Sequence, residues 1–70
     1  MIGFGGNAMG GTTITENGDV LGFTMRSGRY YVAYMAKGDN VSCLGSSFDS
    51  DRQAVSRIMA RRHAVSAAQR

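Results

Sequence analysis

The spacing of apolar residues changes once along the chain. Before residue 50, apolar and polar residues largely alternate with a period of two, which is typical of β-strands. From residue 51 onward, apolar residues recur at spacings of three and four, as on one side of an α-helix. The pattern therefore predicts an α+β fold, in which an antiparallel sheet packs on one C-terminal α-helix.

Glycine-containing turns divide the alternating region into strands. Asn17-Gly18 stands between two β-prone runs, and this dipeptide favours a type I′ hairpin turn because both positions need positive φ. Two later turns contain Gly28 and Gly38. The expected strands span residues 12–15, 20–25, 30–36 and 41–44. Connected in order, they form an antiparallel meander of three or four strands.

The helix is expected from Asp51 to Ala68. Ser50 and Gln53 have the spacing of a capping box, and Asp51 suits the positive end of the helix dipole. The apolar stripe of the helix consists of Val55, Ile58, Met59 and Val65, with Ala54 at its margin. Arg62 falls in the same stripe, and burying an unpaired arginine is energetically costly. We therefore expect the last helical turns to extend beyond the sheet.

Residues 1–11 are expected to form a Gly-rich, flexible N-terminal segment, and residues 12–70 a single ββββα domain. No apolar run approaches the roughly 20 residues that span a bilayer, so we expect no membrane contact. The first residues lack the basic start of a secretory signal, and Cys43 has no partner for an internal disulfide. These features predict a cytoplasmic protein, in the cytoplasm of a host cell if it is phage-encoded.

Strict alternation assigns the strand residues to two sheet faces. The predicted core face carries Leu21, Phe23, Met25, Tyr31, Ala33, Met35 and Leu44. The opposite face carries Thr24, Arg26, Tyr30, Val32, Tyr34, Val41 and Cys43. This second face is more apolar and aromatic than a solvated face needs to be, so it is the predicted functional surface.

The sequence favours a non-catalytic protein without a metal or a cofactor. His63 lies beside Arg61 and Arg62, and these cations disfavour metal binding. Cys43 has no base placed near it by the sequence, and the carboxylates lie in turns or helix caps. The glycines of residues 1–11 do not match a phosphate-binding loop.

Three segments carry a family resemblance: Gly28–Met35, Leu44–Asp49 and Ala54–Ala60. Together they resemble the three-stranded-sheet-plus-helix DNA-binding domain of plant ethylene-response factors, and they are similar to the arm-binding domains of lambda-type phage integrases. The resemblance covers about residues 20–65. It implies that the sheet enters the DNA major groove, and it suggests a phage or mobile-element origin. The chain departs from the family at Val32, Val41 and Cys43, which cannot pair with base edges.

The predicted binding residues combine the aromatic face with the cations of the chain, whose formal net charge is +3. They are Arg26, Arg29, Tyr30, Val32, Tyr34, Arg57, Arg61 and Arg62. The first hypothesis for the partner is DNA, bound through the sheet face and the basic helix. The second is a host protein complex, bound by a phage-encoded inhibitor of the anti-CRISPR or another anti-defence type. The third is a structural or self-associating role, either as a homodimer formed through the sheet face or in virion packing through this face and the N-terminal segment.

Three interpretations of the aromatic face remain open. Tyr30 and Tyr34 can stack nucleotide bases, as aromatic residues on sheet surfaces do for single strands. They can form the centre of a protein interface, where tyrosine is over-represented. The Gly-rich N-terminal segment can also cover them.

Overall fold

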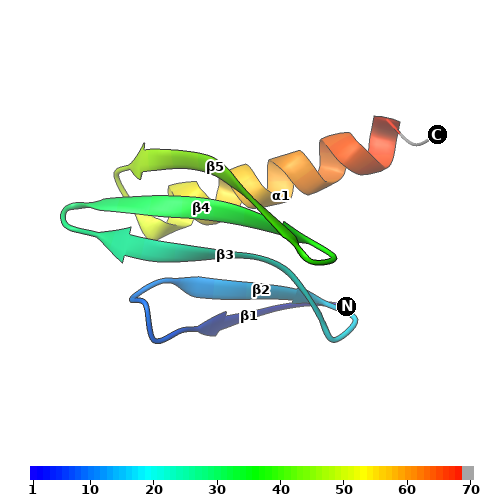
Figure 1. The fold of residues 1–70 in the computed structure, drawn as a ribbon, viewed down its shortest axis with the longest axis horizontal. Coiled ribbons are helices and arrows are strands. Elements are labelled where there is room, and N and C mark those ends of the chain that lie inside the picture. Colours follow the sequence, from blue (N-terminus) through cyan, green and yellow to red (C-terminus); the bar gives the residue numbers. More distant parts are fainter. Residues whose placement is uncertain (69–70) are drawn as a thin grey trace.

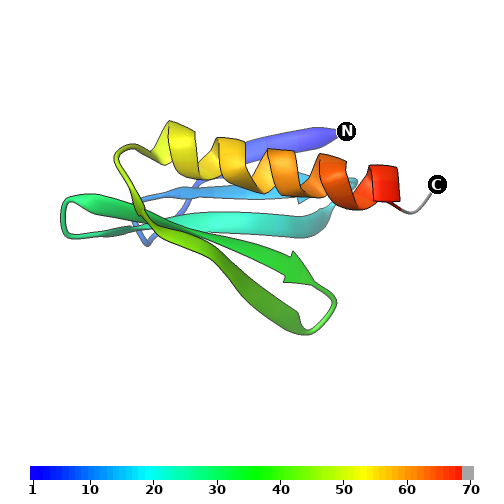
Figure 2. The ribbon, with the colours of Figure 1, turned by 90° about the horizontal axis from the view of Figure 1, so that it is seen from above.

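The computed structural model describes the backbone of residues 1–68 and the side chains of residues 1–63. The elements are β1 (Ile2–Gly6), β2 (Thr12–Glu16), β3 (Asp19–Ser27), β4 (Tyr30–Lys37), β5 (Asn40–Phe48) and α1 (Asp51–Ala68). All five strands form one antiparallel sheet in the order β1-β2-β3-β4-β5 (Figure 1). The helix lies along one side of this twisted sheet (Figure 2). Over residues 1–68 the α+β prediction is confirmed, with five strands instead of three or four.

The fifth strand comes from the segment that we expected to be flexible. Ile2–Gly6 pairs with Thr12–Glu16 without a register shift and forms one edge of the sheet. The Asn7 side chain holds the loop that follows: its Oδ1 accepts the N–H groups of Met9 and Gly11, both at 3.0 Å. Its Nδ2 donates to the Thr24 carbonyl oxygen at 3.0 Å. The segment therefore extends the sheet at its edge.

The local signals for the first hairpin and for the helix are confirmed. Asn17 and Gly18 have φ values of 55° and 90°, as a type I′ turn requires. The Gln53 N–H donates to Ser50 Oγ at 3.2 Å, which caps the first turn of α1. Gln53 Oε1 accepts from the backbone N–H of Asp49, one residue before the position that a regular capping box uses.

The predicted core face of β3 is wrong at Phe23 and Met25. Residues that pair directly across strands lie on the same face, and Thr24 pairs with Ala33 of the core. Thr24 therefore faces α1, whereas Phe23 and Met25 face away from it. The reason is a β-bulge: Thr15 pairs with Val20 and Ile14 with Gly22, so Leu21 is an extra residue in β3.

The remaining core predictions agree with the packing. Leu21, Tyr31, Met35 and Leu44 all pack against the buried cluster of Ile14, Ala33, Ala54 and Ile58. Val55 and Met59 of the predicted helix stripe also contact this cluster. Val65 lies outside the residues whose side chains are described.

Polar contacts join α1 to both ends of β2. The Asp51 carboxylate accepts hydrogen bonds from the hydroxyl groups of Thr12, at 2.5 Å, and of Thr24. Eleven residues along the helix, Arg62 forms an ion pair with Glu16. Arg62 thus occupies the apolar stripe of the helix and is paired with a carboxylate of the sheet. The Arg62–Glu16 pair and the Asp51–threonine contacts fix where the helix lies along the sheet.

Candidate binding surfaces of the sheet and the helix

The side of the sheet opposite α1, here called the outer face, gathers aromatic and aliphatic side chains. Phe23 pairs with Tyr34, and their rings stack with centroids 5.1 Å apart and an interplanar angle of 23°. The cross-strand pairs place the other members on the same side. The apolar and aromatic members of the outer face, with the thiol of Cys43, are Val20, Phe23, Met25, Tyr30, Val32, Tyr34, Ala36, Val41 and Cys43, and the hydroxyl residues Thr13, Thr15 and Ser27 lie on the same side.

Exposure differs across the outer face. Val20, Tyr30 and Val41 are 50%, 42% and 56% exposed, whereas Val32 is 7% exposed. Phe23 and Tyr34 are half-buried by their neighbours in the sheet. The structure therefore brings the predicted residues Tyr30, Val32 and Tyr34 together on one face. Val32 packs beneath its neighbours and offers little surface to a partner. Phe23 and Met25 were not predicted on the outer face, because the bulge at Leu21 cannot be detected from the alternation of apolar and polar residues.

The predicted sheet arginines do not lie among these aromatic residues. Arg26 pairs with Tyr31, so its strand position faces the α1 side, and its Nε donates to the Gly28 carbonyl oxygen at 3.1 Å. Arg29 lies in the turn between β3 and β4. Among the described residues, no charged side chain occupies an outer-face position of a strand.

The three predicted helix arginines have two different environments. Arg57 and Arg61 are exposed. Arg62 donates a hydrogen bond to Glu16, and this bond, reinforced by the charge of the guanidinium, lowers the pKa of Glu16. The same contact raises the pKa of Arg62. Arg57 and Arg61 are therefore the two predicted helix cations available to a ligand, since Arg62 is engaged within the fold.

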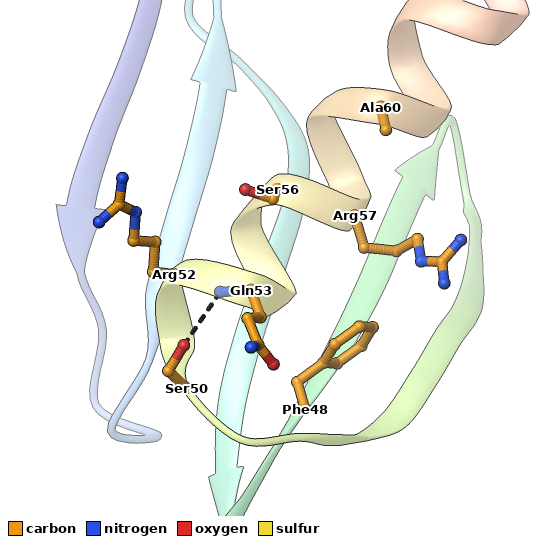
Figure 3. A pocket seen from close by; sticks show the side chains of 7 residues that line it. All are labelled: Phe48, Ser50, Arg52, Gln53, Ser56, Arg57 and Ala60. Carbon is orange, nitrogen blue, oxygen red and sulfur yellow. Dashed lines mark hydrogen bonds between the residues drawn. The ribbon is translucent and has the colours of Figure 1, made fainter.

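A hollow of about 630 Å³ lies beside the first half of α1. Arg52, Gln53, Ser56, Arg57 and Ala60 line it from the helix, and Phe48 and Ser50 line it from the end of β5 and the loop that follows. Figure 3 shows the Phe48 ring and the Arg57 side chain on the same side of the helix, with Arg52 pointing to the other side. Phe48 is not among the predicted binding residues, because its contribution to the hollow depends on where the helix packs.

A smaller hollow of about 190 Å³ follows along the same seam between helix and strand. It is lined by Arg61 of α1, by Ser42 and Leu44 of β5, and by Met35 and Lys37 of β4. Figure 2 shows the β4–β5 hairpin diverging from α1 toward its turn. The two hollows together are called the α1–β5 groove below.

The described residues contain no group of three or more His, Cys, Asp or Glu side chains arranged to hold a metal ion. Cys43 is an exposed free thiol whose Sγ contacts the Gly45 carbonyl oxygen at 3.7 Å. Within the described part of the chain, no helix has the length and apolar character needed to cross a membrane.

Comparisons of the chain with protein-family models, with curated proteins and with solved structures find no significant match. The function of the chain is therefore inferred from the outer face and the α1–β5 groove.

Proposed function

We propose that this chain is a non-catalytic module that binds a partner protein through the outer face of its sheet. The observation that carries the proposal is the uncharged, aromatic character of this face, centred on the stacked pair Phe23–Tyr34. Protein interfaces are depleted of charge at their centre and enriched in Tyr, Phe and Met. An apolar face that the chain itself leaves open fits this composition.

The arrangement of charges also favours a protein partner. Polar and charged residues surround the outer face at the sheet turns, with Arg29 in one turn and Asp39 in another. An apolar centre within a polar rim is the usual arrangement of a protein interface. DNA readout through the same face needs Arg, Lys, Asn or Gln side chains that reach base edges, and the strand positions of the face offer none of them.

The test is partner capture with a matched pair of variants on β5. Val41 lies on the outer face and is 56% exposed, so Val41→Lys places a charge on the face with little effect on folding. Ser42 is its exposed neighbour, but it pairs with Met35 and so faces the α1 side. Ser42→Lys is therefore a control of equal charge on the same strand.

We expect the wild type and Ser42→Lys to capture the same protein and Val41→Lys to lose it. With that protein purified, calorimetry should show a Kd raised about tenfold or more by Val41→Lys, because the lysine would be desolvated without a partner. Equal affinities of the two lysine variants would overturn the proposal. Light scattering is the second readout: a dimer that Val41→Lys dissociates would identify a second copy as the occupant and replace the proposal of a different protein.

A further inference from the structure

The α1–β5 groove contains an aromatic ring held in a fixed place. A Cβ atom built on Gly45 would lie 2.8 Å from both Cε2 and Cζ of Phe48, so the ring occupies the space that a side chain at residue 45 would need. The ring lies between α1 and β5 (Figure 3). Because it is half-buried, the ring presents a partly open apolar surface at the edge of the larger hollow.

Cations follow this ring along the groove. Arg57 lines the larger hollow, and Arg61, four residues later on the same side of the helix, lines the smaller one. Lys37 joins Arg61 from the end of β4. Ser56 and Gln53 add hydrogen-bonding groups beside Arg57.

The acidic residues of α1 and β2 are directed away from the groove. Asp51 is bonded to Thr12 and Thr24, and Glu16 is paired with Arg62. Two further carboxylates lie near the seam. Asp49 stands in sequence between Phe48 and Ser50, which line the larger hollow, and Asp39 lies in the β4–β5 turn. The groove itself is therefore lined by cations and not by carboxylates.

We propose that the α1–β5 groove binds single-stranded nucleic acid. An unpaired base stacks on the Phe48 ring, and the guanidinium groups of Arg57 and Arg61 hold successive phosphates of the strand as it continues along the groove. A volume of about 630 Å³ lies within the ~300–1,000 Å³ of typical ligand pockets. Only a base that is not stacked inside a duplex offers its face to the half-buried ring, so a single strand is expected to bind more tightly than a duplex. This site is separate from the outer face and does not depend on the function proposed above.

The test is fluorescence anisotropy with a short, labelled oligothymidylate. We expect binding at about 50 mM salt that weakens strongly by about 200 mM, as phosphate contacts require. Arg57→Gln combined with Arg61→Gln should raise Kd about tenfold.

A second pair of variants tests the groove without touching its ring. Ser42→Glu introduces a carboxylate beside Arg61 and should also raise Kd about tenfold by repelling phosphate. Val41→Glu makes the same change in charge on the outer face and should affect Kd much less.

Phe48→Leu tests the ring itself: it keeps an apolar group over Gly45 and should weaken binding through lost stacking, about fivefold or more. Thermal unfolding followed by circular dichroism checks that each variant is folded.

Four results would overturn the proposal. The first is no binding of the oligothymidylate at low salt. The second is an equal loss of affinity in Val41→Glu and in Ser42→Glu, which would indicate nonspecific attraction. The third is tighter binding of a duplex than of the single strand. The fourth is equal competition by polyglutamate, which would identify the groove as a site for acidic peptides. None of these results bears on the outer face, whose partner is tested with Val41→Lys.

Discussion

Thr24 shows how one hydroxyl group organises the junction of sheet and helix. The residue is fully buried on the α1 side of β3. Its Oγ1 donates to the Asp51 carboxylate and accepts the backbone N–H of Thr12 at 2.8 Å. A single buried hydroxyl therefore satisfies one donor of β2 and one acceptor at the start of α1.

Replacing Thr24 with valine keeps the shape and removes both hydrogen bonds. We expect Thr24→Val to lower the free energy of unfolding by about 1–3 kcal/mol, because the half-buried N–H group of Thr12 and carboxylate of Asp51 each lose a partner. Urea denaturation measures the change. Thr15→Val is the control, since Thr15 is half-buried on β2 and makes no side-chain hydrogen bond among the described residues. An equal loss of stability in both variants would show that the hydroxyl of Thr24 is not the cause.

The Glu16–Arg62 pair predicts a pH dependence. The hydrogen bond from Arg62 lowers the pKa of Glu16 in the folded chain. The ion pair therefore contributes its full stabilisation above a pH of about 4.3, which is the pKa of the carboxyl group in the unfolded chain. This stabilisation is lost as the pH falls through the lower pKa that Glu16 has in the folded chain. Glu16→Gln should reduce the fall in thermal stability below about pH 4.3. Arg62→Gln should have the same effect, and a wild-type acid profile in either variant would contradict this role of the pair.

At the scale of elements, Gly22 determines how closely α1 approaches the sheet. A Cβ atom at residue 22 would lie 2.9 Å from Ile58 Cγ2 and 2.6 Å from the Tyr34 carbonyl oxygen. Ala33 and Ala54, both fully buried, are the other small residues of this contact. Small residues on both elements allow the Ile58 side chain to fill the space between them.

A methyl group at residue 22 should therefore push the helix from the sheet. We expect Gly22→Ala to destabilise the fold by about 1–3 kcal/mol through overpacking. Gly5→Ala on β1 is the matched control, because a Cβ at residue 5 meets no atom within 4 Å. Its effect should stay within about 0.5 kcal/mol. Urea midpoints that fall equally in both variants would assign the loss to the strand conformation of glycine instead of to helix packing.

Elements with local signals could be predicted from the sequence. Asn17-Gly18 set the first hairpin, and Ser50 with Gln53 set the start of α1, because each signal acts through backbone groups a few residues away. The pairing of β1 could not be predicted, since it depends on contacts between glycine-rich backbone and β2. The bulge at Leu21 was equally invisible, and it reversed the expected faces of Phe23 and Met25.

The candidate surfaces were predictable to a similar extent. The period of two placed Tyr30, Val32 and Tyr34 on one face, and the structure agrees. Arg26 was expected beside them, but the bulge places it on the other side. The α1–β5 groove depends on how the helix packs over β5 and on the lack of a side chain at Gly45, which no local pattern reveals.

At the scale of the whole molecule, apolar and basic surfaces are separated by the sheet. The outer face presents aromatic and aliphatic groups, whereas Arg57 and Arg61 lie along the helix on the other side. The two proposed partners would therefore not compete for the same residues. A chain of 70 residues would be able to hold a protein and a nucleic-acid strand at once.

The two contacts between α1 and β2 also bear on the order of folding. Each strand pairs with the next one along the chain, so the sheet can form by successive hairpins with small losses of loop entropy. The contacts Thr12–Asp51 and Glu16–Arg62 instead join residues 39 and 46 positions apart. They close long loops, so they are expected to form late in folding and to break early in unfolding. During transient opening, the strand pairing of the meander would then persist after the helix has separated from the sheet. The α1 side of the sheet would be exposed to solvent before any hairpin separates.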